Sequence, residues 1–431
     1  MTKEELLKNA RKKPTVSKKK EPTKSSSPRK TTKKKLTVAK KSDEIAETFS
    51  KDPNEIFFRW DDALHKSPNA KYYMAMGERS NGKTFASLEI GLFGYHQDGI
   101  EINGYLDDGS QLGIIRRWEE DFKGKNGAQQ FDNFVHNEIE GNIIEKRTNG
   151  KWNGVFYFSS RWYLCHYDGE GKRDKTDSTP CAFAFALGTG EHAKSSSYPH
   201  VRNILFDEWI TRGHYLVDEF ILFSNILSTI IRRRDDVRIF MCANTISKYD
   251  CPYFVEMGLT NARKMKAGEI DLYKYGESKL EVVLQYTDPP EGEIKSNVYF
   301  AFDNAKLDMI KKGSWEFSNY PHLPVKYKPK DIEYIFLIEF LDEIYQCEII
   351  AIDDSLFVYI HRKTTPIKDD PDTLVYSQDY SIAPNYRRKI SKPQSKLEKT
   401  ILSFFVNDKV YYQDNEVGEA IRGYLRWQAS I

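Results

Sequence analysis

One segment of the chain, residues 77–84, strongly limits the folds available to it. It reads Gly-Glu-Arg-Ser-Asn-Gly-Lys-Thr and fits the G-x-x-x-x-G-K-[ST] pattern of a phosphate-binding loop. The apolar run 72–76 precedes it, and residues 85–92 follow with apolar side chains at helical spacing. Because the motif requires a strand, a tight loop and a helix in this order, the sequence predicts an α/β fold of the P-loop (ASCE) class.

The loop predicts a site for ATP. Its glycines allow backbone N–H groups to surround phosphate oxygens at a helix N-terminus. Lys83 is expected to reach the β- and γ-phosphates, and the Thr84 hydroxyl to complete a Mg²⁺ shell. An ordinary glycine-rich loop is the alternative. Glu78 is unusual here, and is either exposed and without effect or weakens nucleotide binding. The candidate nucleotide-binding residues are Gly77, Glu78, Arg79, Ser80, Asn81, Gly82, Lys83 and Thr84.

A second motif lies at 201–208, where a short apolar strand ends in two carboxylates, Asp207 and Glu208. In P-loop enzymes an Asp at such a strand end holds Mg²⁺. A neighbouring Glu can orient and deprotonate the attacking water, as a hydrolase requires. Any strand that meets its loop can end in this way, but the two motifs together favour ATP hydrolysis. Asp207 and Thr84 are therefore the candidate Mg²⁺ ligands, and Glu208 the candidate base.

The alternation of apolar runs with helical patterns predicts βαβ units and a mainly parallel sheet. Residues 218–234 predict a long amphipathic helix that ends in three arginines. The strand after it places Asn244 at its C-terminal end, where the side chain either senses the γ-phosphate or lytic water or is an ordinary loop residue. The expected strands are Tyr72–Met76, Gln111–Arg116, Val155–Tyr157, Ala182–Leu187, Ile204–Asp207 and Val237–Ala243.

Charge divides the chain unevenly. Residues 1–42 carry 16 Lys/Arg against 3 Asp/Glu, a net charge of +13, whereas the other 389 residues carry a net charge of −11. Since the basic part has almost no large apolar side chains, a tail over 1–50 is predicted to be disordered. It would bind a polyanion such as DNA, structural RNA or an acidic protein surface, or only solubilise the chain.

At 431 residues the chain has room for two domains. We expect the ATPase domain at 51–265, a linker or small subdomain at 266–325, and a second domain at 326–431. No signal peptide is expected because no apolar segment follows the basic residues, and no run of 18 or more apolar residues predicts a membrane span. Five widely spaced cysteines favour a reducing compartment. A zinc site from Cys165, His166, Cys181 and His192 is not expected, since no close cysteine pair supports it.

The last 106 residues predict an α+β domain. Three strands at 333–340, 346–352 and 355–361 form a meander, and helices follow at 396–405 and 417–427. A two-metal nuclease would need converging carboxylates, but Glu339, Asp342, Glu343, Asp353 and Asp354 fall mostly in or beside turns. Aromatic and basic residues interleave through 376–412, which suits nucleic-acid contact but equally a half-buried sheet.

With these motifs, the chain resembles the DNA-packaging ATPases, or encapsidation proteins, of small tailed podoviruses. These are compact relatives of the large-terminase and FtsK- and HerA-like ring translocases. The resemblance covers most of 55–431 and leaves out the basic tail. The segment from Asn244 to Pro252-Tyr253-Phe254 is its most family-specific part. The other stretches that carry it are Gly77–Thr84, Ile114–Trp118, Ile204–Glu208 and Ile230–Arg238.

The resemblance implies a bacteriophage molecular motor: a ring of five identical subunits at the portal vertex of an empty procapsid, in the host cytoplasm. The motor hydrolyses ATP between neighbouring subunits and drives double-stranded DNA through the portal, with a structural RNA as a further partner where one exists, and no membrane. By position, Lys83 and Thr84 bind phosphate and Mg²⁺, Asp207 holds Mg²⁺, and Glu208 activates water.

Arg232 matches the arginine finger that the resemblance places in the neighbouring subunit's site; Arg234 is the nearby alternative, and a purely structural arginine remains open. The C-terminal domain is implied to be RNase H-like and degenerate as a nuclease, with a role in docking or nucleic-acid binding. Two other functions compete: a P-loop DNA translocase or helicase not tied to a capsid, and a non-enzymatic scaffold. The intact catalytic motifs speak against the scaffold.

Overall fold

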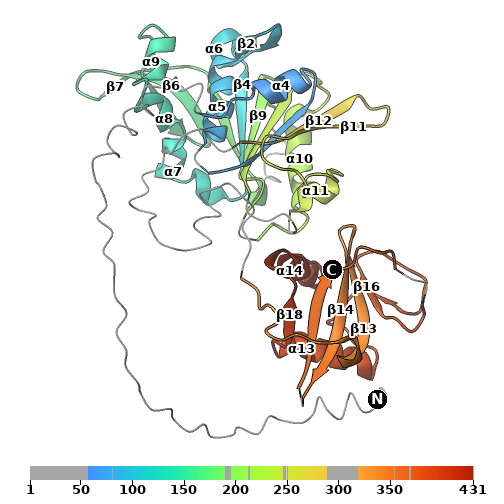
Figure 1. The fold of residues 1–431 in the computed structure, drawn as a ribbon. Coiled ribbons are helices and arrows are strands. Elements are labelled where there is room, and N and C mark those ends of the chain that lie inside the picture. The colour runs from blue at the N-terminus through green and yellow to red at the C-terminus, as the bar shows by residue number, and fades with distance from the viewer. Residues whose placement is uncertain are drawn as a thin grey trace, which may run out of the picture. The chain divides into compact units, whose positions relative to one another are not determined.

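The structure is a computed structural model that describes residues 57–79, 81–189, 196–211, 214–245, 249, 251–288, 319–353, 355–367 and 370–430. These residues form two compact units, one within 57–288 and the other within 319–430 (Figure 1). The predicted basic tail, Ser80, His192 and Asp354 lie outside the described residues. In the part of the chain that is described, no helix combines the length and the apolar character needed to cross a membrane.

The first unit is built on one large sheet whose six central strands run parallel, in the order β12-β1-β10-β9-β4-β8. Antiparallel strands extend both edges: β11 pairs with β12, and β6, β5 and β7 lie beyond β8. The predicted, mainly parallel α/β sheet is thereby confirmed. The strands are β1 Tyr72–Gly77, β4 Gln111–Arg116, β5 Gly154–Phe158, β6 Arg161–Tyr167, β7 Arg173–Thr176, β8 Ala182–Ala186, β9 Val201–Asp207, β10 Arg238–Asn244, β11 Ile270–Tyr275 and β12 Leu280–Tyr286.

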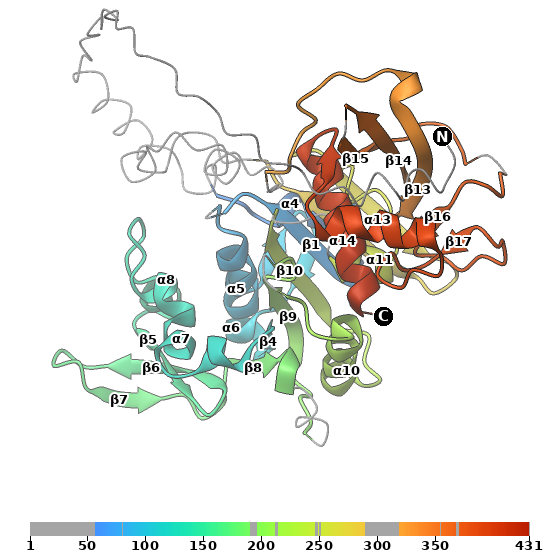
Figure 2. The same ribbon diagram turned by 90° about the horizontal axis from the view of Figure 1, so that it is seen from below.

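Helices cover both faces of this sheet, and α5 and α10 lie on opposite sides of it (Figure 2). Neighbouring residues of a strand point to opposite faces, so Leu205 packs in the core under α5 whereas Phe206 stacks on Phe223 of α10. The helices of the unit are α4 Asp61–Lys66, α5 Lys83–Phe93, α6 Tyr105–Asp108, α7 Lys125–Ala128, α8 Asp132–Val135, α9 Ile143–Arg147, α10 Glu219–Ile231 and α11 Pro252–Glu256. Short 3-10 turns lie at Glu119–Phe122 and Gln129–Phe131, and a small hairpin pairs β2 Tyr95–Gln97 with β3 Ile100–Ile102.

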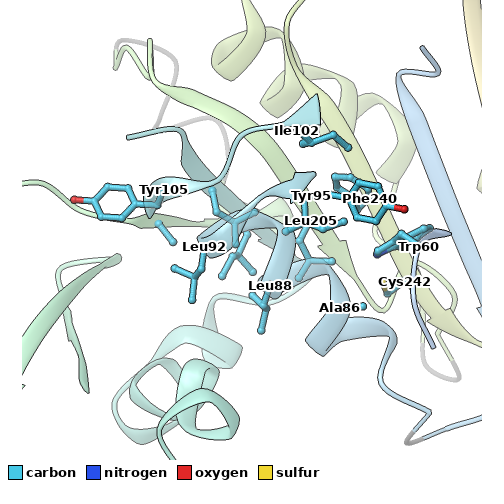
Figure 3. Packing of buried hydrophobic residues seen from close by; sticks show 14 of the residues in the cluster. Trp60, Ala86, Leu88, Leu92, Tyr95, Ile102, Tyr105, Leu205, Phe240 and Cys242 are labelled. Atoms are coloured by element: carbon cyan, nitrogen blue, oxygen red, sulfur yellow. The ribbon is translucent and has the colours of Figure 1, made fainter. Parts of the chain in front are cut away.

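A cluster of buried hydrophobic residues holds α5 against the sheet (Figure 3). Leu88 and Leu92 of α5 pack with Leu205 and Phe240 of the strands. Trp60 closes one end of the cluster, since its indole Nε1 donates to Ser87 Oγ at 3.0 Å and its ring lies 5.2 Å from that of Phe240. Trp60 and Phe58 therefore pack on the core of the first unit.

Two differences from the expected element bounds concern the first unit. Strands β11 and β12 fall in the range 266–325 that the sequence suggested as linker or subdomain, yet β12 pairs with β1 and buries Val282, Val283 and Leu284. Charged residues interrupt both strands, which weakens their sequence pattern. Helix α10 ends at Ile231 rather than at residue 234, because Arg232 takes a left-handed conformation with a φ of 54°.

The second unit is an α+β domain with a six-stranded sheet in the order β17-β16-β13-β14-β15-β18. The antiparallel meander β13-β14-β15 and both helices appear where the sequence predicted them. Strands β16 and β17 run parallel to β13, and β18 runs parallel to β15. The elements are a 3-10 turn at Pro329–Asp331, β13 Ile332–Phe340, β14 Glu343–Ile352, β15 Ser355–Arg362, β16 Val375–Ser377, β17 Tyr386–Arg387, α13 Lys396–Val406, β18 Val410–Tyr412 and α14 Asn415–Ser430.

Candidate active site

The candidate phosphate loop, residues 77–84, connects β1 to α5, and α5 begins at Lys83. Gly82 precedes the helix with a φ of 96°, a conformation that side chains disfavour. A Cβ atom at Gly82 would also lie 3.2 Å from Cβ of Phe57. Gly77 is required by close approach as well, because a Cβ atom there would lie 1.9 Å from Thr287 Oγ1. Both glycines therefore have steric reasons to be glycine.

Lys83 is buried, with its ammonium group inside the loop. Its Nζ donates to the carbonyl oxygen of Glu78 at 2.6 Å and to Asn81 Oδ1 at 3.0 Å. Asn81 in turn donates to Thr287 Oγ1 at 3.0 Å, which ties the loop to the chain that follows β12. The loop thus holds a cation at the start of a helix, where backbone N–H groups also favour an anion.

Two neighbours of Lys83 in the loop add to this picture. Glu78 is only 5% exposed, so the alternative of an exposed and ineffective carboxylate is wrong. Arg79 Nε is buried and has no hydrogen-bond partner within the described residues. A buried donor without an acceptor is costly, and a bound phosphate oxygen would satisfy it.

Asp207 lies at the carboxyl end of β9, next to the phosphate loop. Its Oδ1 accepts a hydrogen bond from Thr84 Oγ1 at 3.0 Å, and its Oδ2 accepts one from Arg116 Nη2 at 2.5 Å. A hydroxyl and a carboxylate side by side are hard oxygen ligands of the kind that Mg²⁺ prefers. The guanidinium of Arg116 already places positive charge against the same carboxylate, so a divalent cation would have to share Asp207 with it.

Glu208 leaves the line of its strand. Its φ of 63° is left-handed, a conformation that costs a non-glycine residue about 1–2 kcal/mol. Asp207 before it and Trp209 after it are buried, whereas the Glu208 side chain is 61% exposed. The turn therefore presents this carboxylate to solvent beside the candidate Mg²⁺ ligands, 3.9 Å from Arg116 Nη1. Its backbone N–H donates to the carbonyl oxygen of Cys242 at 2.7 Å.

Asn244 ends β10 directly opposite Gly77 of β1 in the parallel register. Lys83, Thr84, Asp207, Glu208 and Asn244 consequently come together at the carboxyl edge of the sheet, as the rule for open α/β sheets predicts. Behind them, burial and then the charge of Asp207 raise the pKa of Cys242 to about 12, so this thiol stays neutral.

Sequence reasoning missed an ion pair beneath the site. Arg117 Nε and Nη2 donate to the two carboxylate oxygens of Glu219, at 2.7 and 2.8 Å. Burial lowers the pKa of Arg117, but the hydrogen bond and charge of Glu219 outweigh it and raise the pKa above its ordinary value. The one available signal was that Arg116 and Arg117 sit at the carboxyl end of a parallel strand, where functional groups gather.

The two candidate finger residues lie at the opposite edge of the sheet. Arg234 donates to four carbonyl oxygens, including that of Val201 at the start of β9. Since β9 has seven residues, this edge is about 20 Å from Asp207. Arg232 is exposed and donates to the carbonyl oxygen of Ser196 at 2.7 Å. Neither arginine reaches the phosphate loop of its own subunit.

A polar pocket adjoins the site on the side of Thr84 and Arg116. Four amide side chains and Asp121 form much of its wall, so it offers many hydrogen-bond acceptors next to the candidate Mg²⁺ ligands. Its lining residues are Thr84, Phe85, Leu88, Arg116, Asp121, Asn126, Gln129, Gln130, Asn133 and Phe134.

Three solved structures are similar to this chain at low identity. The Phi-28 gp11 DNA packaging motor is 17% identical and covers 86% of this chain and 98% of its own, with a TM-score of 0.42. The bacteriophage Phi-29 viral genome packaging motor assembly is 16% identical and covers 86% of this chain and 99% of its own, with a TM-score of 0.47. The N-terminal domain of the DNA packaging ATPase from bacteriophage phi29 is 19% identical and covers 56% of this chain and 99% of its own, with a TM-score of 0.39.

Sequence comparison is more specific. The model of the podovirus DNA encapsidation protein (Gp16) family matches residues 165–272, which include Asp207, Glu208 and Arg232 but not the phosphate loop. The DNA packaging proteins of Bacillus phages PZA and phi29 are each 31% identical over 93 residues, or 21% of this chain and 28% of theirs. The chain thus spans less than a third of the length of the curated relatives it matches. Over this segment, these matches confirm that the chain is related to the podovirus DNA encapsidation proteins, as its sequence predicted.

Proposed function

We propose that this protein is a viral DNA-packaging motor ATPase, which hydrolyses ATP to move double-stranded DNA through the portal into a preformed procapsid. The observation that carries the proposal is one sheet edge that combines the phosphate-loop lysine, the Thr84–Asp207 pair and the turned-out Glu208. The relation to proteins named for DNA packaging supports the choice of substrate.

In this proposal the residues of the phosphate loop hold ATP, with Lys83 against its β- and γ-phosphates. Thr84 and Asp207 hold Mg²⁺, which supplies charge neutralisation to the phosphates when bound. Glu208 accepts a proton from the attacking water, and its exposure beside the ligands suits that role. Asn244 lies between these groups, where an amide can contact the terminal phosphate or the water.

Arg232 is the better candidate for an arginine finger in a ring of identical subunits, five in our proposal. Arg234 is held by four carbonyl oxygens of its own chain, so a move into another subunit would leave all four without that donor. Arg232 is exposed and donates to one such oxygen, the carbonyl of Ser196, at 2.7 Å. The amide-lined pocket beside Thr84 gives a guanidinium from the neighbouring subunit an approach to the site.

For the second unit we propose a vestigial RNase H-like domain that docks on a partner or binds nucleic acid without cutting it. Arg362 supports this assignment because its guanidinium contacts three carboxylates, those of Glu343, Asp414 and Glu416, at 2.8–3.8 Å. A cation among the carboxylates competes with the metal ions that a nuclease would need. The portal, the procapsid and a structural RNA are the candidate partners, at the portal vertex in the host cytoplasm.

The deciding experiment measures ATP-dependent protection of double-stranded DNA from DNase, with the purified full-length chain and cognate empty procapsids. We expect protection with the wild type and none with Glu208→Gln. DNA-stimulated ATP hydrolysis without protection would contradict packaging and favour a translocase or helicase that is not tied to a capsid. Absence of ATP hydrolysis would contradict the enzymatic assignment itself.

A further inference from the structure

The turn that carries Glu208 rests on a buried polar network. Arg117 is 4% and Glu219 is 2% exposed. Each carboxylate oxygen of Glu219 accepts two hydrogen bonds: one oxygen from Arg117 Nη2 and Tyr253 OH, the other from Arg117 Nε and the backbone N–H of Leu216. Burial, and then the charge of Glu219, raise the pKa of Tyr253 well above its ordinary value, so its hydroxyl remains a donor.

The guanidinium also reaches the catalytic turn itself. Arg117 Nη1 donates to the carbonyl oxygen of Glu208 at 3.0 Å, and Nη2 lies 3.4 Å from that of Trp209. One rigid, planar group therefore binds Glu219 on one side and the backbone of the turn on the other. A lysine could not make both sets of contacts, because it lacks the fork geometry of arginine.

The turn needs such a restraint. A left-handed glutamate persists only where its surroundings hold it, and the Glu208 backbone is held by the Cys242 carbonyl on its N–H and by Arg117 on its carbonyl oxygen. Without the second contact, rotation about the φ of Glu208 would swing the carboxylate away from Asp207 and Arg116. The direction of the carboxylate thus depends on Arg117.

The family-specific segment 252–254 belongs to the same support. Tyr253 donates to Glu219, and the rings of Tyr253 and Phe254 pack edge-on against Trp209, at 6.0 and 5.5 Å. Tyr253, which lies 34 positions after Glu219 in the chain, thereby connects the carboxylate that anchors Arg117 with the ring of Trp209. Stability alone does not explain the ion pair, since well-packed apolar side chains usually serve a buried position equally well or better.

We propose that Arg117, anchored by Glu219, is a positioning residue for ATP hydrolysis: it holds the strained Glu208 turn so that the carboxylate faces the attacking water. This inference rests on the proposed function. Besides the motif residues, the inference assigns a role to the Arg117–Glu219 pair, which contacts neither the nucleotide nor the metal in the proposed mechanism. Its effect on the reaction must pass through Glu208, and that dependence can be measured.

The test is a double-mutant cycle in the full-length chain, with kcat for ATP hydrolysis, the Kd of a non-hydrolysable ATP analogue with Mg²⁺, and the Tm as readouts. Arg117→Lys should lower kcat by about 100-fold, as expected for a misplaced catalytic group. The Kd should hold, because no nucleotide contact is lost. In the Glu208→Gln background, Arg117→Lys should cause no further loss of kcat.

A matched control is Arg202→Lys, which alters an ion pair with Asp236 at the far end of β9. It should leave kcat within about twofold, as is usual for surface ion pairs. An equal loss from Arg117→Lys in both backgrounds would mean that the network is only structural, and would overturn the inference while leaving the proposed function standing.

If Arg117→Lys does not fold, Glu219→Gln replaces it in the same double-mutant cycle, because the amide keeps the shape of the Glu219 side chain and removes its charge. The expected result is again a loss of kcat that requires Glu208, and an additive loss would overturn the inference. A wild-type chain without ATPase activity would overturn the proposed function and this inference together.

Discussion

Lys83 and Glu208 act on different parts of the same reaction, so their variants should fail in different ways. Lys83→Ala removes the cation inside the loop and should abolish nucleotide binding. Glu208→Gln keeps the size and exposure of the side chain but removes the base, so it should bind ATP with wild-type affinity and lower kcat by at least about 100-fold. Titration with a fluorescent ATP analogue, beside turnover assays, measures both. Equal losses of binding in the two variants would contradict this division.

Arg232 and Arg234 should also separate. Arg232→Ala and Glu208→Gln should each be inactive alone but regain ATPase activity when mixed, because some sites in a mixed ring would combine an intact Glu208 with an intact Arg232 from the neighbour. Arg234→Ala removes contacts to four carbonyl oxygens and should instead lower the free energy of unfolding by about 2 kcal/mol or more. A mixture of Arg232→Ala and Glu208→Gln that regains no activity would contradict a role in trans.

How far single residues could be predicted depends on their spacing. Lys83, Thr84, Asp207 and Glu208 follow from contiguous motifs, and the structure brings them together. Arg117, Glu219 and Tyr253 lie up to 102 positions apart in hydrogen-bonded pairs, and nothing local marks them as partners. Glu78 illustrates a further limit, because the pattern of the loop did not reveal that its side chain is buried.

At the scale of elements, the junction of β1 with its loop depends on a close approach to the chain after β12. Gly77→Ala would place a methyl group 1.9 Å from Thr287 Oγ1, and Thr287 is buried. We expect a loss of about 1–3 kcal/mol in the free energy of unfolding, as for other overpacked sites, together with weaker ATP binding. Chemical denaturation measures the first effect. Gly169→Ala is the control, since its Cβ atom would meet nothing within 4 Å.

The strands of this sheet differ in how clearly the sequence predicts them. Strands β1, β9 and β10 are nearly uniform apolar runs, as expected for strands covered on both faces, and they were found. In β11 and β12, charged residues interrupt the apolar ones, so their sequences resemble that of an exposed loop. Their place in the sheet follows from pairing with β1, which a local pattern does not contain.

In the second unit, a hydrogen-bonded pair of β14 and β15 should make local stability depend on pH. The hydrogen bond to Glu348 raises the pKa of His361 above 6.5, and bonds from His361, Tyr327 and Gln346 lower the pKa of Glu348 below 4.5 despite its burial. His361 therefore stabilises the fold fully below pH 6.5 and loses that effect as pH rises through its raised pKa. The contribution of Glu348 is present above pH 4.5 and lost as pH falls through its lowered pKa.

Hydrogen exchange of residues 343–362 should consequently be slower at pH 6 than at pH 8.5, after correction for the intrinsic exchange rate. The His361→Gln variant should lose this difference, because its side chain does not titrate. A pH dependence that survives the substitution would show that another group is responsible.

At the scale of the whole molecule, the basic tail should govern binding to nucleic acid. Deleting residues 1–42 removes a net charge of +13 and leaves a chain with a net charge of −11. DNA affinity should fall, and the slope of log K against log salt concentration should become shallower. Filter binding at several salt concentrations measures both. A control tail of equal length, with Gln in place of Lys at 18–20 and 33–35, separates charge from length. An unchanged slope after deletion would contradict the prediction.

Helix α10 has a consequence for how subunits take turns. It begins at Glu219, which is tied through Arg117 to the turn of Glu208, and it ends just before Arg232, 13 residues or about 20 Å away. In a ring built as proposed, one end of α10 is connected to the subunit's own nucleotide site, and the other end lies at the nucleotide site of the next subunit. The order in which the subunits hydrolyse ATP would then depend on the stiffness of this one helix, and no further element would be needed to couple the sites.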